Sequence, residues 1–287
     1  AQSDGLTHSS IWCIVKDNQG TLWLGTYFGG VNYFNPEYEI YSRYMYSPIE
    51  KKGLSNPVVG RTIEDKDGNL WIGTEGGGLN YYNRRTREFK WFRPEIGPNS
   101  ISHNNIKALY YDASKDIIWI GTHLGGLNRL DIRSGRFTHY RMEAGNPETL
   151  PSDIIRDIAP YQDHLVIATQ NGICLFDPAN GKCQQLFQDS KEGKKIKMVA
   201  DVTFDSNGTL WIAATGEGVF SYRFDTGKLT NYRHDSANPN SLSNNNVNNI
   251  MQDSQGHLWF STSGSGLDLY HPANNDFENF DKEKNGL

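Results

Sequence analysis

Short stretches of alternating apolar and polar residues run along the chain, and glycine, asparagine and aspartate separate them. In one region an apolar pair, Ile106 and Leu109, precedes the segment Ile118-Trp119-Ile120-Gly121-Thr122. A further apolar position, Leu127, and the aromatic pair Phe137 and Tyr140 follow it. No stretch has a persuasive helical period over about 11 residues or more, so this pattern predicts short β-strands joined by turns.

The same pattern returns six times along the sequence. The central tryptophan or its replacement lies at Trp23, Trp71, Trp119, Val166, Trp211 and Trp259, at intervals of 45 to 48 residues. A glycine follows in each copy, at Gly30, Gly78, Gly126, Gly172, Gly218 and Gly266. The apolar and aromatic positions downstream keep one register in all six copies, so we interpret the chain as a repeat protein.

An aspartate precedes the tryptophan in most copies. It lies at Asp17, Asp65, Asp112, Asp205 and Asp253, and Tyr161 replaces it in the fourth copy. In four copies a glycine comes three residues after the aspartate, at Gly20, Gly68, Gly208 and Gly256. An aspartate side chain caps a tight turn, and glycine takes the left-handed position at its end. The spacing therefore predicts a hairpin turn between the first two strands.

Four strands in each unit are typical of a β-propeller blade. We therefore predict an all-β fold, one propeller domain over 1–287, in which a tryptophan from each blade packs between neighbouring blades. The predicted four-stranded blades span approximately 5–46, 53–94, 100–142, 149–188, 195–234 and 241–282. The last residues, 285–287, match 4–6, which predicts a seventh unit and a segment of a longer repeat protein, part of a seven-bladed or double propeller.

Composition narrows the class of protein. The chain has 28 lysines and arginines against 33 aspartates and glutamates, and it lacks a basic stripe, so we expect no nucleic-acid partner. No apolar run approaches the roughly 20 residues that cross a bilayer, and no charged-then-apolar leader begins the chain. Three cysteines do not make a disulfide framework.

The units resemble the regulator-propeller repeats of hybrid two-component sensors in gut bacteria. The resemblance rests on the stretch 65–74, on Gly77-Gly78-Leu79-Asn80-Tyr81, and on the inter-blade stretch 238–243. It implies a periplasmic sensor region, commonly two seven-bladed propellers and a small β-sandwich ahead of one membrane span and a cytoplasmic histidine kinase. It also implies an oligosaccharide or other small-molecule signal and a homodimeric, membrane-anchored parent protein. The chain departs from that pattern in having six units.

Residues that vary between units on the loops and innermost strands are candidates for ligand binding. Aromatic rings stack on sugars, and arginine suits planar carboxylates, so uronic or sulfated glycans are conceivable ligands. The candidates are Tyr27, Phe28, Glu75 and His123 in the loops after the tryptophan segments, and Arg61, Arg156, Asp157, Asp201 and Asn248, with Lys107 and Asn249, on the first strands. The alternatives are ordinary solvated loops for the first group and ion pairs between blades for the second.

Catalytic motifs are missing from the sequence, so we expect a signalling segment without catalysis, cofactor or metal. Asp65-Lys66-Asp67-Gly68 faintly resembles a calcium loop, but it lacks the downstream glutamate and is better interpreted as a turn. One alternative is a propeller enzyme similar to streptogramin lyases, in which His123 faces Glu75. Another is a scaffold that binds only proteins.

Two cysteines bracket the last hairpin of the fourth unit. Cys174 and Cys183 flank a turn near Pro178 and Ala179, which predicts that they lie opposite each other. A periplasmic location permits a disulfide, and two packed thiols are equally compatible with the sequence. Cys13 has no local partner and is interpreted as a core residue.

Overall fold

The computed structural model describes residues 6–35, 40–49 and 52–281, and these fold into six four-stranded antiparallel sheets. Each sheet lies within one predicted blade, which confirms an all-β propeller fold with six blades. The residues that suggested a seventh unit, 4–5 and 285–287, lie outside the described part of the chain. No helix among the described residues is long and apolar enough to cross a membrane.

Two compact units divide the chain, and each contains three blades. The first is Ala1–Arg141 with Asp153–Ile155, and the second is Met142–Ser152 with Arg156–Leu287. The strands of the first unit are β1 (Ile11–Lys16), β2 (Leu22–Thr26), β3 (Val31–Asn35), β4 (Ile40–Tyr44), β5 (Val59–Glu64), β6 (Leu70–Thr74), β7 (Leu79–Asn83), β8 (Glu88–Phe92), β9 (Ile106–Asp112), β10 (Ile117–Thr122), β11 (Leu127–Asp131) and β12 (Arg136–Tyr140).

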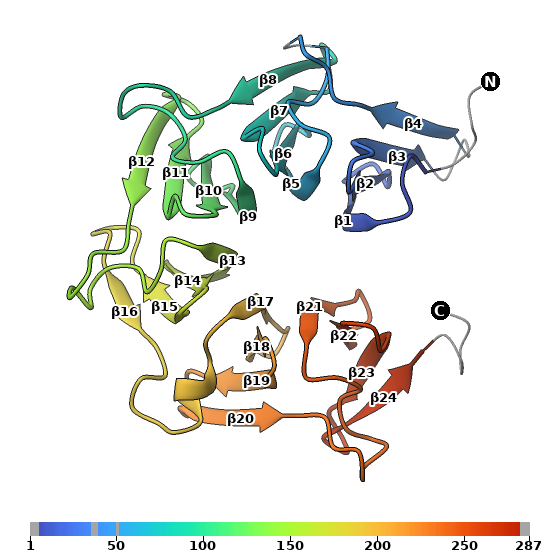
Figure 1. Cartoon of the computed structure of the whole chain (residues 1–287), viewed down its shortest axis with the longest axis vertical. Coiled ribbons are helices and arrows are strands. Elements are labelled where there is room, and N and C mark those ends of the chain that lie inside the picture. Colours follow the sequence, from blue (N-terminus) through green and yellow to red (C-terminus); the bar gives the residue numbers. More distant parts are fainter. Residues whose placement is uncertain (1–5, 36–39, 50–51, 282–287) are drawn as a thin grey trace. The chain divides into compact units, whose positions relative to one another are not determined.

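The second unit repeats this arrangement, with one short 3₁₀ helix before its second blade. Its elements are β13 (Ile155–Tyr161, whose first residue belongs to the first unit), β14 (His164–Thr169), β15 (Gly172–Phe176), β16 (Cys183–Gln185), η1 (Gly193–Lys195), β17 (Val199–Phe204), β18 (Leu210–Ala214), β19 (Gly218–Arg223), β20 (Lys228–Tyr232), β21 (Val247–Gln252), β22 (Leu258–Thr262), β23 (Leu267–His271) and β24 (Asp276–Phe280). Within each unit the first strands of the blades lie on the inner side and the fourth strands on the outer side (Figure 1).

Apolar side chains fill the space between neighbouring blades of a unit. Trp71, only 3% exposed, packs with Ile106 and Ile120 of the next blade. In the second unit Trp211 packs in the same way with Val247 and Phe260. The predicted tryptophan contacts are therefore confirmed inside each unit, and truncating such a side chain to alanine typically costs about 3–5 kcal/mol.

The aspartate turn holds the tryptophan as well as the backbone. Oδ1 of Asp65 accepts hydrogen bonds from the backbone N–H groups of Asp67 and Asn69, at 3.0 and 2.9 Å. Oδ2 accepts one from Nε1 of Trp71 at 3.0 Å. The same carboxylate–indole bond joins Asp17 to Trp23, Asp205 to Trp211 and Asp253 to Trp259. The prediction that these stretches are turns is confirmed, and the indole bond adds a contact that the sequence pattern did not predict.

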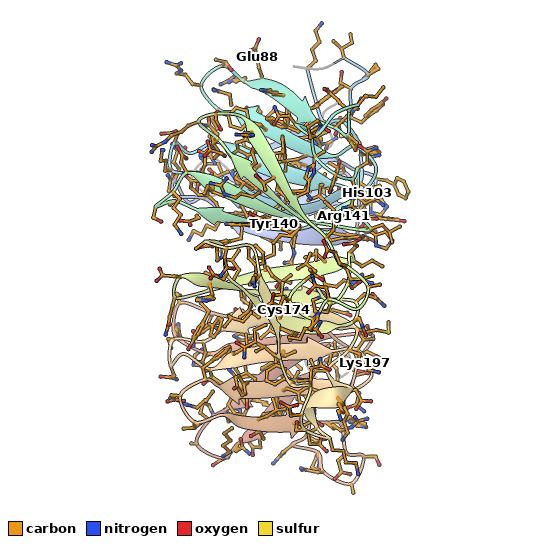
Figure 2. All side chains as sticks on the ribbon, turned by 90° about the vertical axis from the view of Figure 1, so that its left-hand side faces the viewer. Glu88, His103, Tyr140, Arg141, Cys174 and Lys197 are labelled. Carbon is orange, nitrogen blue, oxygen red and sulfur yellow. The ribbon has the colours of Figure 1, made fainter. Side chains whose placement is uncertain are left out.

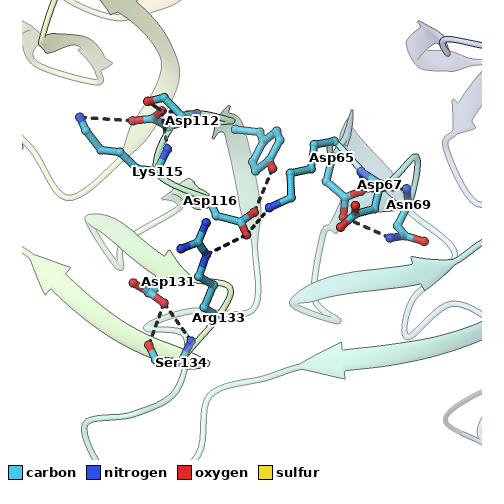
Figure 3. A network of polar contacts seen from close by, with 12 residues as sticks. Asp65, Asp67, Asn69, Asp112, Lys115, Asp116, Asp131, Arg133 and Ser134 are labelled. Atoms are coloured by element: carbon cyan, nitrogen blue, oxygen red, sulfur yellow. Dashed lines mark hydrogen bonds and ion pairs between the residues drawn. The ribbon is translucent and has the colours of Figure 1, made fainter.

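The turn of the third blade also holds a charged cluster (Figure 3). Asp116 has a left-handed backbone with φ of 60° and accepts hydrogen bonds from Tyr111, Lys66 and Arg133. Its carboxylate lies 2.5 Å from the lysine nitrogen of the neighbouring blade. The hydrogen bond from Lys66, with those of Tyr111 and Arg133, lowers the pKa of Asp116 although burial opposes the shift.

In four blades a buried amide or carboxylate fastens the incoming loop to the third strand. Asn80 is fully buried; its Oδ1 accepts from the backbone N–H of Ser55 at 2.8 Å, and its Nδ2 donates to Oγ of Ser55 at 2.8 Å. Equivalent pairs are Asn32 with Thr7, Asn128 with Ser102, and Asp268 with Ser243. Both partners satisfy each other, so the polar contact is compatible with a dry interior.

Cys174 occupies the position of that amide in the fourth blade (Figure 2). Cys174 and Cys183 are buried free thiols whose Sγ atoms are 3.1 Å apart. The prediction that they lie directly opposite is wrong, because Cys174 pairs with Gln185 and Cys183 pairs with Phe176. They are diagonal neighbours on one face of the hairpin. Burial, together with the adjacent Cys183 thiol, raises the pKa of Cys174.

Candidate functional site

The loops between the second and third strands of the blades, called here the B–C loops, lie against the loops that enter the blades. In the first unit the backbone N–H of Tyr27 donates to Ser10, and that of Glu75 donates to Val58. In the second unit the N–H of Ser263 donates to Asn246. Within each unit the two groups of loops therefore lie on one face.

A β-bulge near the start of the first strand brings side chains to these loops. The register between β1 and β2 shifts at Ile11 and Cys13, so Trp12 is an extra residue in its strand. Bulges at the same place leave Lys107 extra in β9 and Asn248 extra in β21. An extra residue escapes the strict alternation of a strand. Its side chain is then free to reach the first residue of a B–C loop.

Three aromatic residues of the first blade form an exposed cluster at this face. Trp12, Tyr27 and Phe28 are 48%, 36% and 57% exposed. The rings of Trp12 and Tyr27 stack with centroids 5.2 Å apart and an interplanar angle of 11°. Tyr27 meets Phe28 edge to face at 4.4 Å. Large rings gathered in solvent are typical of recognition sites, so we define this set as the aromatic cluster.

The tip of the B–C loop has a left-handed backbone. The second loop residue has φ of 106° at Gly76, 79° at Gly216 and 79° at Gly264, where glycine adopts this conformation without strain. In the first and third blades the position holds Phe28 and Leu124, with φ of 71° and 74°. A side chain there costs about 1–2 kcal/mol of backbone strain.

An ion pair borders the aromatic cluster. Nζ of Lys107 donates to Oε1 of Glu75, and the same ammonium lies 5.9 Å from the centroid of the Trp12 ring. Both charged side chains are partly exposed, at 22% for the lysine and 23% for the glutamate. The structure therefore brings the predicted residues Tyr27, Phe28 and Glu75 into one neighbourhood.

His123 belongs to a second group of residues, on the third blade. Its ring meets that of His103 at a centroid distance of 6.3 Å. His103 and Arg141 lie beside each other (Figure 2), and burial, with the Arg141 charge, lowers the pKa of His103. Nη1 of Arg141 donates to the carbonyl of Leu124 at 3.0 Å. No group of three or more residues suited to a metal ion occurs in the described ranges.

The remaining predicted residues make contacts inside or between blades. Nε of Arg156 donates to Gln170 Oε1 at 3.1 Å, and Oδ1 of Asn248 accepts from Ser263 at 3.1 Å. Each bond joins a first strand to the B–C loop of its own blade. Arg61 lies at the corresponding bulge of β5 and is half-buried.

Two predicted carboxylates tie neighbouring blades of the second unit together. Oδ2 of Asp157 accepts from the backbone N–H of Val202 at 3.2 Å. Asp201 is 3% exposed, and its Oδ2 accepts from the N–H of Ile250 at 2.8 Å. These contacts support a structural role, and ligand binding by either carboxylate stays a prediction.

Trp12 is the residue of this site that sequence reasoning missed. It is a tryptophan outside the repeat register, and Gly60, Lys107 and Asn248 occupy its position in other units. That departure is a signal in the sequence. The bulge that turns the ring toward Tyr27 is not visible in an alternating pattern.

Comparison with protein families gives a direct match to the repeat. The family model described as two component regulator propeller matches residues 5–28, 53–76 and 241–264, each covering the first two strands of a blade. In three of its six blades the chain therefore matches two-component regulator propeller repeats. A second family model, described as SMP-30/Gluconolactonase/LRE-like region, matches residues 108–218. The search of curated proteins finds no match.

Solved structures share the fold of this chain. The extracellular domain of a hybrid two-component system from B. thetaiotaomicron is 22% identical, with a TM-score of 0.79 over 99% of this chain and 36% of that one. A second such domain from the same organism is 20% identical, with a TM-score of 0.69 over 92% and 38%. This chain thus spans a little over a third of the length of these chains.

A propeller enzyme has a similar fold. The structure of a catalytically inactive virginiamycin B lyase from Staphylococcus aureus is 14% identical, with a TM-score of 0.71 over 96% of this chain and 86% of that one. At such identities the likeness to any of these structures concerns the fold alone.

Proposed function

We propose that this chain is a ligand-sensing part of a hybrid two-component sensor and has no catalytic role of its own. The observation that carries the proposal is the match of regulator-propeller repeats to the first, second and sixth blades. The extracellular two-component domains with the same fold support it. Since the chain spans little more than a third of those domains, the rest of the sensor belongs to the proposal as well.

In this proposal the segment lies in the periplasm and belongs to a membrane-anchored homodimer. A ligand that binds the propeller shifts the balance between two states of the parent protein, and a cytoplasmic histidine kinase reads that shift. A ligand changes such an equilibrium only by as much as it prefers one state. The sensor therefore needs a ligand-binding surface, and the shared face of B–C loops and incoming loops offers one.

The proposed signal is an oligosaccharide. Exposed aromatic rings offer flat apolar surfaces to sugar rings, and the neighbouring polar side chains offer donors and acceptors to sugar hydroxyls. The aromatic cluster supports this class of ligand over an ion or a fully apolar molecule, because Lys107 and Glu75 stand at its border.

Calorimetry with the 287-residue chain tests the proposal. The chain is titrated with panels of neutral, uronic and sulfated oligosaccharides, and each mixture is then separated by chromatography to detect products. Saturable binding with unchanged sugar supports the sensor. New products support an enzyme instead, and the absence of binding to every panel contradicts oligosaccharide sensing.

The enzyme remains the second candidate because of the fold it shares with the lyase. In that case His123 and Glu75 are the acid–base candidates, but Glu75 is the partner of Lys107 in this structure. Turnover of a cyclic streptogramin, followed by mass spectrometry, tests it. A protein-binding scaffold is the interpretation that remains if neither small ligands nor substrates interact.

A further inference from the structure

We propose that the aromatic cluster of Trp12, Tyr27 and Phe28, together with the Lys107–Glu75 ion pair, binds an electrically neutral sugar ring of the signal. This inference rests on the proposed function and adds to it a location and a class of oligosaccharide. Three observations carry it: the conformation of Phe28, the position of Trp12 and the charge balance at the border of the cluster.

Phe28 is a poor choice for folding at its position. The left-handed conformation favours the glycine found at Gly76, Gly216 and Gly264, yet a phenylalanine is held there with φ of 71°. Its ring is 57% exposed, so little burial offsets the strain. Strain without a folding benefit is found at functional positions. Leu124 of the third blade has the same strain at 55% exposure, so Phe28 is distinguished by its aromatic ring and by the rings beside it.

The exposure of Phe28 follows from the loop and not from an uncovered blade. Ile14 of β1 is 60% exposed, whereas the equivalent Leu109 and Ile250 of other blades are 9% and 5% exposed. The tip of the B–C loop is different, because Gly76 is exposed although its blade packs between two others in the first unit. A ring at the tip of the B–C loop is therefore exposed because of its place in the loop.

Trp12 adds a second large ring from another element. It is the extra residue of a bulge, and it stacks on Tyr27 instead of packing between blades. The contacts from Trp12 to Tyr27 and from Tyr27 to Phe28 join a strand and a loop into one aromatic surface. A sugar ring that covers such side chains buries apolar surface, which contributes roughly 25 cal/mol per Å².

The charges at the border favour a neutral ligand. The ammonium of Lys107 is paired with the carboxylate of Glu75, so the pair has no net charge. It still offers both hydrogen-bond donors and acceptors to adjacent hydroxyl groups. A uronate or sulfate group placed here finds the Lys107 ammonium already paired with Glu75, so it gains little attraction to set against the loss of its own hydration. The expected order of affinity is therefore neutral over acidic oligosaccharides.

Two glycine substitutions test the location with a matched control. Phe28→Gly removes the ring and relieves the left-handed strain, and Leu124→Gly makes the same change in the third blade. Trp12→Ala removes the second ring. Binding of the tightest neutral oligosaccharide, measured by calorimetry, should weaken by about tenfold or more in Phe28→Gly and Trp12→Ala. Leu124→Gly should bind like the wild type.

The measurements separate this inference from the proposed function. The thermal unfolding midpoint of Phe28→Gly should not fall, so lost binding in that variant is not lost folding. Neutral sugars bound equally by all variants overturn the location and leave the sensor proposal standing. A preference for acidic sugars in the wild type overturns the charge argument. If no oligosaccharide binds, the proposed function fails together with this inference.

A charge variant gives an independent check. Glu75→Gln leaves the Lys107 ammonium without its counter-charge at the edge of the cluster. Affinity for uronic oligosaccharides should then rise relative to neutral ones, and the gain should shrink in high salt because screening weakens exposed charges. An unchanged ratio between the two sugar classes places the ligand elsewhere.

Discussion

Removal of the Asp65 carboxylate should destabilise the protein, because this group holds the indole of Trp71 between two blades. In Asp65→Ala the indole N–H of Trp71 loses its acceptor, and the backbone N–H groups of Asp67 and Asn69 lose theirs. The side chain of Asp65 is itself buried, at 8% exposed, and Trp71 is 3% exposed. Water therefore has little access to the indole nitrogen.

The magnitude follows from the hydrogen bonds. A bond to a charged group contributes about 1.5–3 kcal/mol, and a buried donor left without a partner costs about 1–3 kcal/mol. The backbone N–H of Asp67 lies in the exposed part of the turn and regains water, whereas that of Asn69 is buried. We therefore expect Asp65→Ala to lower the free energy of unfolding by about 3 kcal/mol, most of it through Trp71.

Urea unfolding followed by tryptophan fluorescence and circular dichroism measures this loss. Asp67→Ala is the matched control, because Asp67 is exposed in the same turn and should change stability by less than about 0.5 kcal/mol. A double-mutant cycle with Trp71→Phe isolates the bond, with a coupling energy expected at about 1.5 kcal/mol. Equal losses in Asp65→Ala and Asp67→Ala, or a coupling near zero, would refute the reasoning.

Three further predictions concern buried positions. Burial raises the pKa of Asp268, so the stability that this residue contributes is lost as the pH rises through the pKa of the folded state. In urea unfolding, the free energy of unfolding of Asp268→Asn should therefore rise relative to that of the wild type between about pH 4 and pH 7. A constant difference between the two proteins contradicts this prediction. Cys174 and Cys183 should resist alkylation at about pH 8 until urea unfolds the chain, because burial raises the pKa of Cys174. Mass spectrometry measures the labelling, and rapid labelling of the folded protein refutes this prediction. Gly73→Ala should lower the free energy of unfolding by about 1–3 kcal/mol, because the new Cβ would lie 2.6 Å from Cγ2 of Ile106. In an Ile106→Ala background the same substitution should cost less. Losses that simply add in the double variant contradict the proposed clash.

The sequence predicts the blades and their turns because their signals are local. The aspartate, the glycine three residues later and the tryptophan form one hairpin, and the structure confirms it at Asp65, Gly68 and Trp71. The bond from the second carboxylate oxygen to the indole depends on the twist of the hairpin. Spacing alone does not contain that angle.

The candidate site was predicted in part. Tyr27 and Phe28 stand out as aromatic residues in a variable loop, and the structure places both in one exposed cluster. Asp157 and Asp201 instead accept hydrogen bonds from neighbouring blades. For Asp201 the difference arises at the bulge of β17, because one extra residue reverses which side chains of a strand face inward. An alternation counted from sequence does not locate that extra residue.

The bulge also separates a position that varies between blades from the apolar core positions beside it. Its extra residue is Trp12 in the first blade, Lys107 in the third, Ala200 in the fifth and Asn248 in the sixth, so chemically unrelated side chains occupy it above the same apolar layers. A substitution of the bulge residue changes the side chain that the blade presents near its B–C loop, and it leaves the neighbouring Ile106 or Val247 in the core. Specificity and folding are thereby under independent control, blade by blade.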